Sequence, residues 1–207
     1  MRTVEIIGYK RANLGKAEAK RLRSESQVPC VLYGGKEQIH FSSPMILFRD
    51  VVYTPEAAFV KLNIEGKEYS AILQDIQFHP VSEVILHADF LALSDDKYIK
   101  MDIPVKFTGT SPGIIQGGKL LIKLRHVRIK ALPANMPETI TMDVSGLKLG
   151  KSMKVASIKT EEFEILNNPR VTLASVQIPR ALKGAEGEDE EGDEEGEGEE
   201  ASEETEA

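Results

Sequence analysis

The chain has 207 residues, enough for one large domain or two small ones. Its single cysteine, Cys30, excludes an internal disulfide and a cysteine metal cluster. No apolar run approaches the roughly 18 residues of a membrane-spanning helix, and the N-terminal sequence lacks the features of a signal peptide. We therefore expect a cytoplasmic protein that does not contact a membrane.

The net charge of −7 is unevenly distributed along the chain. Residues 181–207 carry a net charge of −13, residues 1–95 of −1, and residues 96–180 of +7. Without the acidic end the chain is positive, as is typical of a protein that binds a polyanion. Residues 10–23 contain six bases and one acid, which makes them the most basic short segment of the first half.

Strands and one basic helix are predicted for the first half of the chain. Residues 3–9 predict a strand, residues 16–26 a polar helix, and residues 28–33 an apolar strand closed by Gly34-Gly35. Ser43 and Pro44 are typical of an N-cap and first helical position, so we expect a helix of about ten residues after them. Further strands are expected at residues 60–64 and 68–78, which Glu65-Gly66-Lys67 joins as a hairpin, and at residues 84–90.

Alternation in the last of these strands predicts two faces. Val84, Leu86, Ala88 and Phe90 would share one face, and Ile85, His87 and Asp89 the other. His87 and Asp89 would then project together, either toward a ligand or simply toward solvent on a barrel wall. The strand pattern does not separate these two interpretations.

A boundary is expected near residues 93–98, followed by a second β-rich region. Its short strands are separated by proline and glycine turns, and His126, Arg128 and Lys130 alternate with apolar Val127 and Ile129. Residues 181–207 are acidic and contain almost no large apolar side chain, which predicts disorder. The expected organisation is a mainly β protein with short helices. It comprises a domain at residues 1–95, a β-rich domain at 96–180 and a disordered acidic tail at 181–207.

Nothing in the sequence organises a catalytic or metal site. No local motif joins a nucleophile to a base and an orienting group, and Cys30 in an apolar strand is typical of a buried structural thiol. The four histidines lack metal-ligand spacing. SPGIIQGGKL resembles a phosphate loop only faintly, and turn geometry explains it better. We expect no enzyme activity, cofactor, metal or small-molecule substrate.

The basic segment suggests contact with nucleic acid. Its bases could neutralise RNA phosphates, although a solvated helix face is an equally good interpretation of the charge alone. Tyr33, beside a glycine turn, could pack on a sugar or base, although a half-buried core tyrosine is the commoner outcome.

Two segments resemble signatures of one family. RANLGKAEAKRLRSESQVPCVLYGG and AILQDIQFHPVSEVILHADFLAL resemble, in the same order, signatures of the bacterial large-subunit ribosomal proteins that bind 5S rRNA. DIPVKFTGTSPGIIQGGKL, ALPANMPETITMDVSGLKLG and the acidic tail resemble the long form of that family, the general stress protein Ctc. The resemblance covers about residues 1–180.

The resemblance implies an N-terminal six-stranded β-barrel that docks on the loop E region of 5S rRNA from its minor-groove side. It implies a ribosome-associated protein whose second domain adjoins further RNA or neighbouring ribosomal proteins. Glu18, where relatives have a small residue, adds a negative charge to the RNA side. The RNA-binding positions that the resemblance implies are Arg11, Lys16, Lys20, Arg21, Arg23, Tyr33, Gln77, His79, His87 and Asp89.

Two other functions compete with a structural role in the ribosome. An RNA-modifying enzyme would require a nucleophile motif, metal cluster or cofactor loop, and the sequence offers none of these. A stress or chaperone-like protein acting off the ribosome would use the acidic tail to compete with RNA or to tether basic partners. Sedimentation with the large subunit at moderate salt distinguishes the ribosomal role from both.

Overall fold

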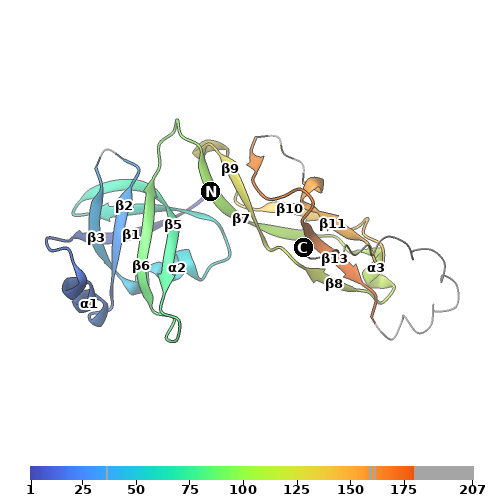
Figure 1. Cartoon of the computed structure of the whole chain (residues 1–207). Helices are drawn as coiled ribbons and strands as arrows, with labels where there is room; N and C mark the ends of the chain where they lie inside the picture. Colours follow the sequence, from blue (N-terminus) through green and yellow to red (C-terminus); the bar gives the residue numbers. More distant parts are fainter. Residues whose placement is uncertain (36, 159, 161, 180–207) are drawn as a thin grey trace, which may run out of the picture.

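The computed structural model describes residues 1–35, 37–158, 160 and 162–179; the acidic tail, predicted to be disordered, lies outside these ranges. Figure 1 shows two β regions along the long axis of the molecule, with the first six strands forming one region and the later strands the other. This arrangement confirms the prediction of a mainly β protein with short helices.

Six strands close into a barrel in the order β1-β3-β2-β6-β5-β4, as the resemblance implied. Parallel pairing of β1 with β4 and of β2 with β6 completes a ring in which the other neighbours are antiparallel. The barrel strands are β1 (Arg2–Lys10), β2 (Gln27–Tyr33), β3 (Ile39–Pro44), β4 (Ala58–Ile64), β5 (Lys67–Phe78) and β6 (Ile85–Ala92).

Alternating apolar side chains fill the barrel. Val60, Leu62 and Ile64 of β4 point inward, and the predicted hairpin follows. Its turn places Glu65 at φ 51° and Gly66 at φ 84°, the positive angles that tight hairpins require. Aromatic rings occupy the centre of the core, where the Phe90 ring lies 5.8 Å from that of Phe41 and 6.2 Å from that of Phe48.

The basic helix α1 (Lys16–Ser24) packs on the barrel with one side only. Leu22 is its buried residue, as expected for a polar sequence with few apolar positions. Arg23 fixes the helix to the sheet because its Nε donates a hydrogen bond to the carbonyl of Leu86 in β6, at 3.0 Å. The helix is therefore held in a defined place beside β2 and β6.

The helix of about ten residues predicted after Ser43 is confirmed only in part: residues 45–52 are helical, but Ser43 does not cap them. Strand β3 runs on through Pro44, and the chain then forms a 3-10 turn, η1 (Met45–Phe48), and a single turn of helix, α2 (Arg49–Val52). Ser43 is buried, and its hydroxyl donates to the carbonyl of Ile7 at 2.8 Å instead of capping a helix. Pairing with the neighbouring strand outweighs the local capping preference.

The predicted faces of β6 are correct for its second half and wrong for its start. Ala88 and Phe90 are buried and His87 and Asp89 lie on the opposite face, as predicted, but Ile85 is also buried. The pairing with β5 shifts between Gln77 and Phe78, so the strand carries an irregularity before His87. Such a bulge reverses the alternation locally, which a period-of-two pattern does not predict.

The second region contains a four-stranded sheet, β10-β7-β9-β12, and a three-stranded sheet, β11-β13-β8. Val127 and Ile129 are buried while His126 and Arg128 are exposed, as the alternation predicted. The elements are β7 (Ile99–Thr108), α3 (Pro112–Ile115), β8 (Lys119–Ile122), β9 (His126–Ala131), η2 (Pro133–Asn135), β10 (Ile140–Asp143), β11 (Ser152–Lys154), η3 (Val155–Ser157), β12 (Glu164–Ile165) and β13 (Thr172–Gln177).

One apolar cluster joins the two regions. Ile72 of the barrel is 1% exposed and packs in the same cluster as Ile103 and Ile129 of the second region. Ala57, which precedes β4, belongs to this cluster too. The barrel therefore contributes apolar surface to the core of its neighbour.

The segment that faintly resembled a phosphate loop is a turn of helix between strands. Ser111 caps α3, and its hydroxyl accepts a hydrogen bond from the Gly113 N–H at 3.1 Å. Gly118 lies so close to Gly113 and Leu149 that an added Cβ would stand 2.5 Å from their atoms. These glycines serve close packing, which agrees with the preferred interpretation of the sequence.

Candidate nucleic-acid interface

Four strands of the barrel bring side chains from distant parts of the sequence into one row on its outer surface. His40 in β3 stands opposite Val31 in β2, Val31 opposite Asp89 in β6, and Asp89 opposite Asp75 in β5. Their strand neighbours Phe41, Cys30 and Ala88 are fully buried, so the row lies on the outer face of the barrel, where Val31 is covered and only 8% exposed. We call His40, Val31, Asp89 and Asp75 the outer row.

His87 and Gln77 lie beside the outer row. They are paired across β6 and β5, and both project from the same wall as Asp89. The Nδ1 of His87 lies 2.7 Å from the Oδ1 of Asp89. That oxygen is nevertheless buried without a well-directed hydrogen bond from the described residues, so the short contact does not satisfy it.

Arg11 places a second unsatisfied polar atom on this wall. Its backbone N–H donates to the carbonyl of His40 at 3.0 Å, which fixes the residue at one end of the outer row. Its Nε is buried and has no hydrogen-bond partner among the described residues. Burial raises the pKa of the Cys30 thiol, Asp89 raises it further and Arg11 opposes the rise, which places both charges close to that strand.

Tyr33 ends β2 on the same outer wall and is half-buried. Burial raises the pKa of its hydroxyl, and the charges of Asp89 and Asp75 raise it further. The phenol therefore remains protonated and able to donate a hydrogen bond at neutral pH.

The four predicted cations of α1 have different surroundings. Lys16 and Lys20 are exposed and form no ion pair within the described ranges. Arg21 is held by Glu18 at 2.6 Å and by Glu25 at 3.1 Å, which raises its pKa and lowers that of Glu18. With Arg23 bonded to the barrel, the two lysines are the cations best placed to meet phosphates.

His79 forms hydrogen bonds within the turn between β5 and β6, and not with the outer row. It follows β5, and its Nδ1 accepts hydrogen bonds from the N–H groups of Val81 and Ser82, both at 3.3 Å. The ring thus stabilises the turn between β5 and β6. It is exposed, at the end of the strand that carries Gln77.

Two polar members of the outer row were not predicted from the sequence. His40 and Asp75 reach the surface that holds Asp89 only through the pairing of β3, β2, β6 and β5. Their separation along the chain gives no sign of this proximity. The QD pair before Gln77 was the available signal for Asp75.

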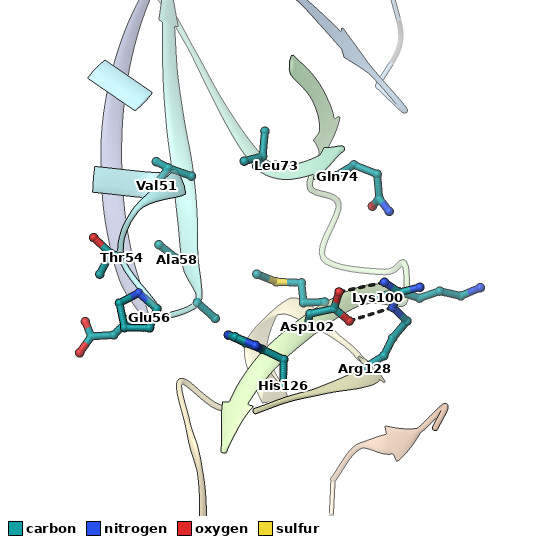
Figure 2. A pocket seen from close by; sticks show the side chains of 13 residues that line it. Val51, Thr54, Glu56, Ala58, Leu73, Gln74, Lys100, Asp102, His126 and Arg128 are labelled. Atoms are coloured by element: carbon teal, nitrogen blue, oxygen red, sulfur yellow. Dashed lines mark hydrogen bonds and ion pairs between the residues drawn. The ribbon is translucent and has the colours of Figure 1, made fainter. Parts of the chain in front are cut away.

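A cleft of about 460 Å³ lies between the two regions, away from α1. Figure 2 shows Val51, Thr54 and Glu56 on its barrel side and Lys100, Asp102, His126 and Arg128 on the other. Arg128 donates two hydrogen bonds of 2.8 Å to the Asp102 carboxylate, which lowers the pKa of that carboxyl. Asp102 and Arg128 thus satisfy each other and link the two strands β7 and β9.

The described residues contain neither a candidate metal site nor a membrane-spanning helix. No group of three or more His, Cys, Asp or Glu side chains there is arranged to hold a metal ion. Among the helices in these ranges, none has the length and apolar content to span a membrane.

Comparison with known proteins matches each half of the chain to a protein family. Residues 6–90 match the Ribosomal L25p family, and residues 98–180 match the C-terminal domain of ribosomal protein TL5. Relatives named large ribosomal subunit protein bL25 are 55% identical in Cytophaga hutchinsonii and 53% identical in Amoebophilus asiaticus. These alignments cover 90% and 92% of this chain and 97% of each relative.

A more distant relative of the same name, from Porphyromonas gingivalis, is 41% identical over 89% of this chain and 97% of its own length. The barrel coincides with the first family match and the two further sheets with the second. The chain therefore belongs to the large ribosomal subunit protein bL25 family, in the long form that carries both domains.

Proposed function

We propose that this structural protein of the large ribosomal subunit binds the loop E region of 5S rRNA through the outer wall of its barrel. The wall comprises the outer row with Arg11, Tyr33, Gln77 and His87, and α1 lies beside it. Family membership supports the ribosomal role and not an enzymatic one. The observation that carries the RNA proposal is a pair of buried polar atoms that form no hydrogen bond with the described residues: Arg11 Nε, and Asp89 Oδ1, which has His87 Nδ1 as a close neighbour at 2.7 Å.

Unpartnered buried atoms are costly, and a bound RNA would satisfy both. Leaving a buried donor or acceptor without a partner costs about 1–3 kcal/mol, and more for a charged group. The wide minor groove of RNA exposes 2′-hydroxyls and base edges, which include amino donors for a carboxylate. Asp89 would accept from such a donor, and Arg11 would donate to a phosphate or sugar oxygen.

The lysines of α1 supply the second part of the proposed interface. A carboxylate facing a polyanion is unfavourable unless neighbouring cations offset the repulsion. Lys16 and Lys20 lie on a helix that Arg23 fixes beside β6, so their charges are close to the wall that carries Asp89. They would bind phosphates and so fix the position of the protein along the RNA. The outer wall would contact the groove and recognise its shape.

We assign this binding to a domain comprising residues 1–95, with a second domain at 96–180 facing other ribosomal components. All the proposed RNA-binding residues precede residue 95. The second domain would contact further rRNA or a neighbouring ribosomal protein, consistent with its charge of +7. Assembly into ribosomes would place the protein in the cytoplasm.

The proposal is tested with the full-length chain and isolated 5S rRNA. We expect tight binding to intact 5S rRNA and clearly weaker binding to a 5S rRNA whose loop E is replaced by Watson–Crick pairs. A second RNA, with another internal loop replaced instead, controls for general misfolding of the RNA. Equal affinity for all three RNAs would contradict recognition of loop E.

A further inference from the structure

The three-stranded sheet of the second region has an unusual charge composition. Residues 119–125, 144–154 and 171–179, which contain β8, β11, β13 and the turn before β11, include no aspartate or glutamate. They contain six basic residues: Lys119, Lys123, Arg125, Lys148, Lys151 and Lys154. The sheet is therefore a surface of one charge sign.

Three cations elsewhere in the same region have acidic partners. Arg128 pairs with Asp102 at 2.8 Å, Lys130 with Glu164 at 3.0 Å, and Lys106 approaches Glu56 at 4.0 Å. In the described part of the chain, none of the six bases around β13 forms such a pair. Their positive charge is balanced by solvent ions alone or by a ligand outside those ranges.

Three of these lysines surround the point where the chain leaves the sheet. Lys119 stands opposite Gln177, the last residue of β13, in the neighbouring strand. On the other side, the Val176 N–H donates to the carbonyl of Lys151 at 3.1 Å, and Lys151 N–H donates to the carbonyl of Lys148 at 3.2 Å. All three side chains are exposed. We call Lys119, Lys148 and Lys151 the exit lysines.

We propose that the acidic tail, residues 181–207, docks back onto the exit lysines of its own chain and occupies a surface that would otherwise attract a polyanion. The tail carries fourteen acids and one lysine. It follows β13, which lies between Lys119 of β8 and the turn before β11 that carries Lys148 and Lys151. The tail is thereby an intramolecular competitor for polyanions at the second domain. This proposal does not depend on the loop E assignment.

The geometry of the chain permits this contact. The first acid of the tail, Glu186, follows Gln177 by nine residues, a stretch that reaches up to about 30 Å when extended. The three strands of the sheet span only about 10 Å. Because the tail is tethered, its effective concentration at the lysines is on the order of millimolar, so weak electrostatic attraction suffices.

The test places a spin label in the tail and reads its contacts by NMR on the full-length chain. Cys30 is fully buried, and its burial raises the pKa of its thiol, so a cysteine at Ser202→Cys takes the label selectively. We expect loss of amide signals around Lys119 and at residues 148–151 at about 20 mM salt. These signals should return at about 500 mM salt, where the Debye length falls from roughly 20 Å to roughly 4 Å.

Two triple variants make the result specific. Lys119→Gln, Lys148→Gln and Lys151→Gln together should abolish the signal loss at the sheet. Lys67→Gln, Lys97→Gln and Lys100→Gln remove the same charge from exposed positions elsewhere and should leave it intact.

Signal loss that is the same in both triple variants, or that falls on α1 instead, would overturn the proposal. A titration with duplex RNA tests whether the exit lysines are free to bind RNA in the full-length chain. If duplex RNA perturbs the exit lysines equally in the full-length chain and in one ending at residue 180, the tail does not occupy them and the proposal is wrong.

Discussion

The outer wall of the barrel and the β8–β13–β11 sheet are both polar surfaces, but their chemistry differs. The barrel wall mixes acids and bases, and two of its buried polar atoms, on Asp89 and Arg11, form no hydrogen bond with the residues that the structure describes. The sheet displays exposed bases without any acid. A surface of the first kind suits a ligand of defined shape, because only matching donors and acceptors satisfy it. A surface of the second kind attracts any polyanion.

Net charge and the proposed RNA site point to different halves of the chain. The barrel half has a net charge of −1 and the second region +7, so charge by itself favours the second region as the RNA-binding part. The barrel is distinguished instead by unsatisfied hydrogen-bonding groups beside a small cluster of cations. The predictions below alter the barrel and its helix α1 first, and then a pair of side chains in the second region.

The largest effect is expected from damage to the barrel core. Phe90→Ala removes a fully buried ring that packs on Phe41 and Phe48, and such changes cost about 3–5 kcal/mol. Chemical unfolding followed by circular dichroism should show this loss, together with loss of 5S rRNA binding. Phe78→Ala, at a ring that is 40% exposed, is the control and should change stability little. Similar losses for both variants would contradict the core assignment.

Lys20→Ala should have the next largest effect. Removing one phosphate contact weakens binding to every RNA by a similar factor and makes the salt dependence shallower by about one unit on a log–log plot. Lys67→Ala, at an exposed lysine on the β4–β5 hairpin, is the matched control. An unchanged salt slope for Lys20→Ala would remove this lysine from the interface.

Glu18→Gln should strengthen RNA binding by a smaller factor. The substitution releases Arg21 from its closest partner and removes a negative charge from α1. Affinity for 5S rRNA at low salt should rise roughly two- to fivefold, a modest gain because exposed ion pairs are weak. Adding Arg21→Ala to Glu18→Gln should cancel most of that gain. Weaker binding of the single variant would show that the pair itself positions the helix.

The smallest effect concerns the pair that links β7 and β9. Arg128 lowers the pKa of the Asp102 carboxyl from its usual 3.8, so its stabilisation is present above about that pH and is lost as the pH falls through the lowered value. Both side chains are about half exposed, so solvent screening limits the effect to under about 1 kcal/mol. Thermal unfolding between pH 5 and about pH 2.5 should show a slightly smaller loss of stability for Asp102→Asn than for the unaltered chain. Identical pH profiles would contradict this contribution.

The sequence predicts elements better than it predicts their contacts. Strand periodicity located the hairpin turn at Glu65-Gly66, and the helical spacing of basic residues located the helix α1. The family signatures implied the barrel. The bulge that buries Ile85 could not be predicted, because it arises from a shift in pairing with β5. Ser43 likewise has the local features of a helix cap, but its hydroxyl finds a partner in β1.

The candidate site was predicted only in part for the same reason. His87 and Asp89 lie two residues apart on one strand, so alternation alone placed them together. His40 and Asp75 join them only through strand register, which a single sequence does not encode locally. The different roles of Arg21 and Arg23 also depend on contacts, with Glu18 and with the carbonyl of Leu86.

Affinity of Asp89→Asn for two RNAs tests the central claim most directly. The amide keeps the shape of the side chain but loses its charge and part of its capacity to accept hydrogen bonds. The two RNAs are intact 5S rRNA and the variant whose loop E is replaced by Watson–Crick pairs. We predict that Asp89→Asn lowers the preference for intact loop E, whereas Lys20→Ala weakens both RNAs equally and leaves that preference unchanged. Equal weakening of both RNAs by Asp89→Asn would contradict a barrel wall that reads the shape of the RNA.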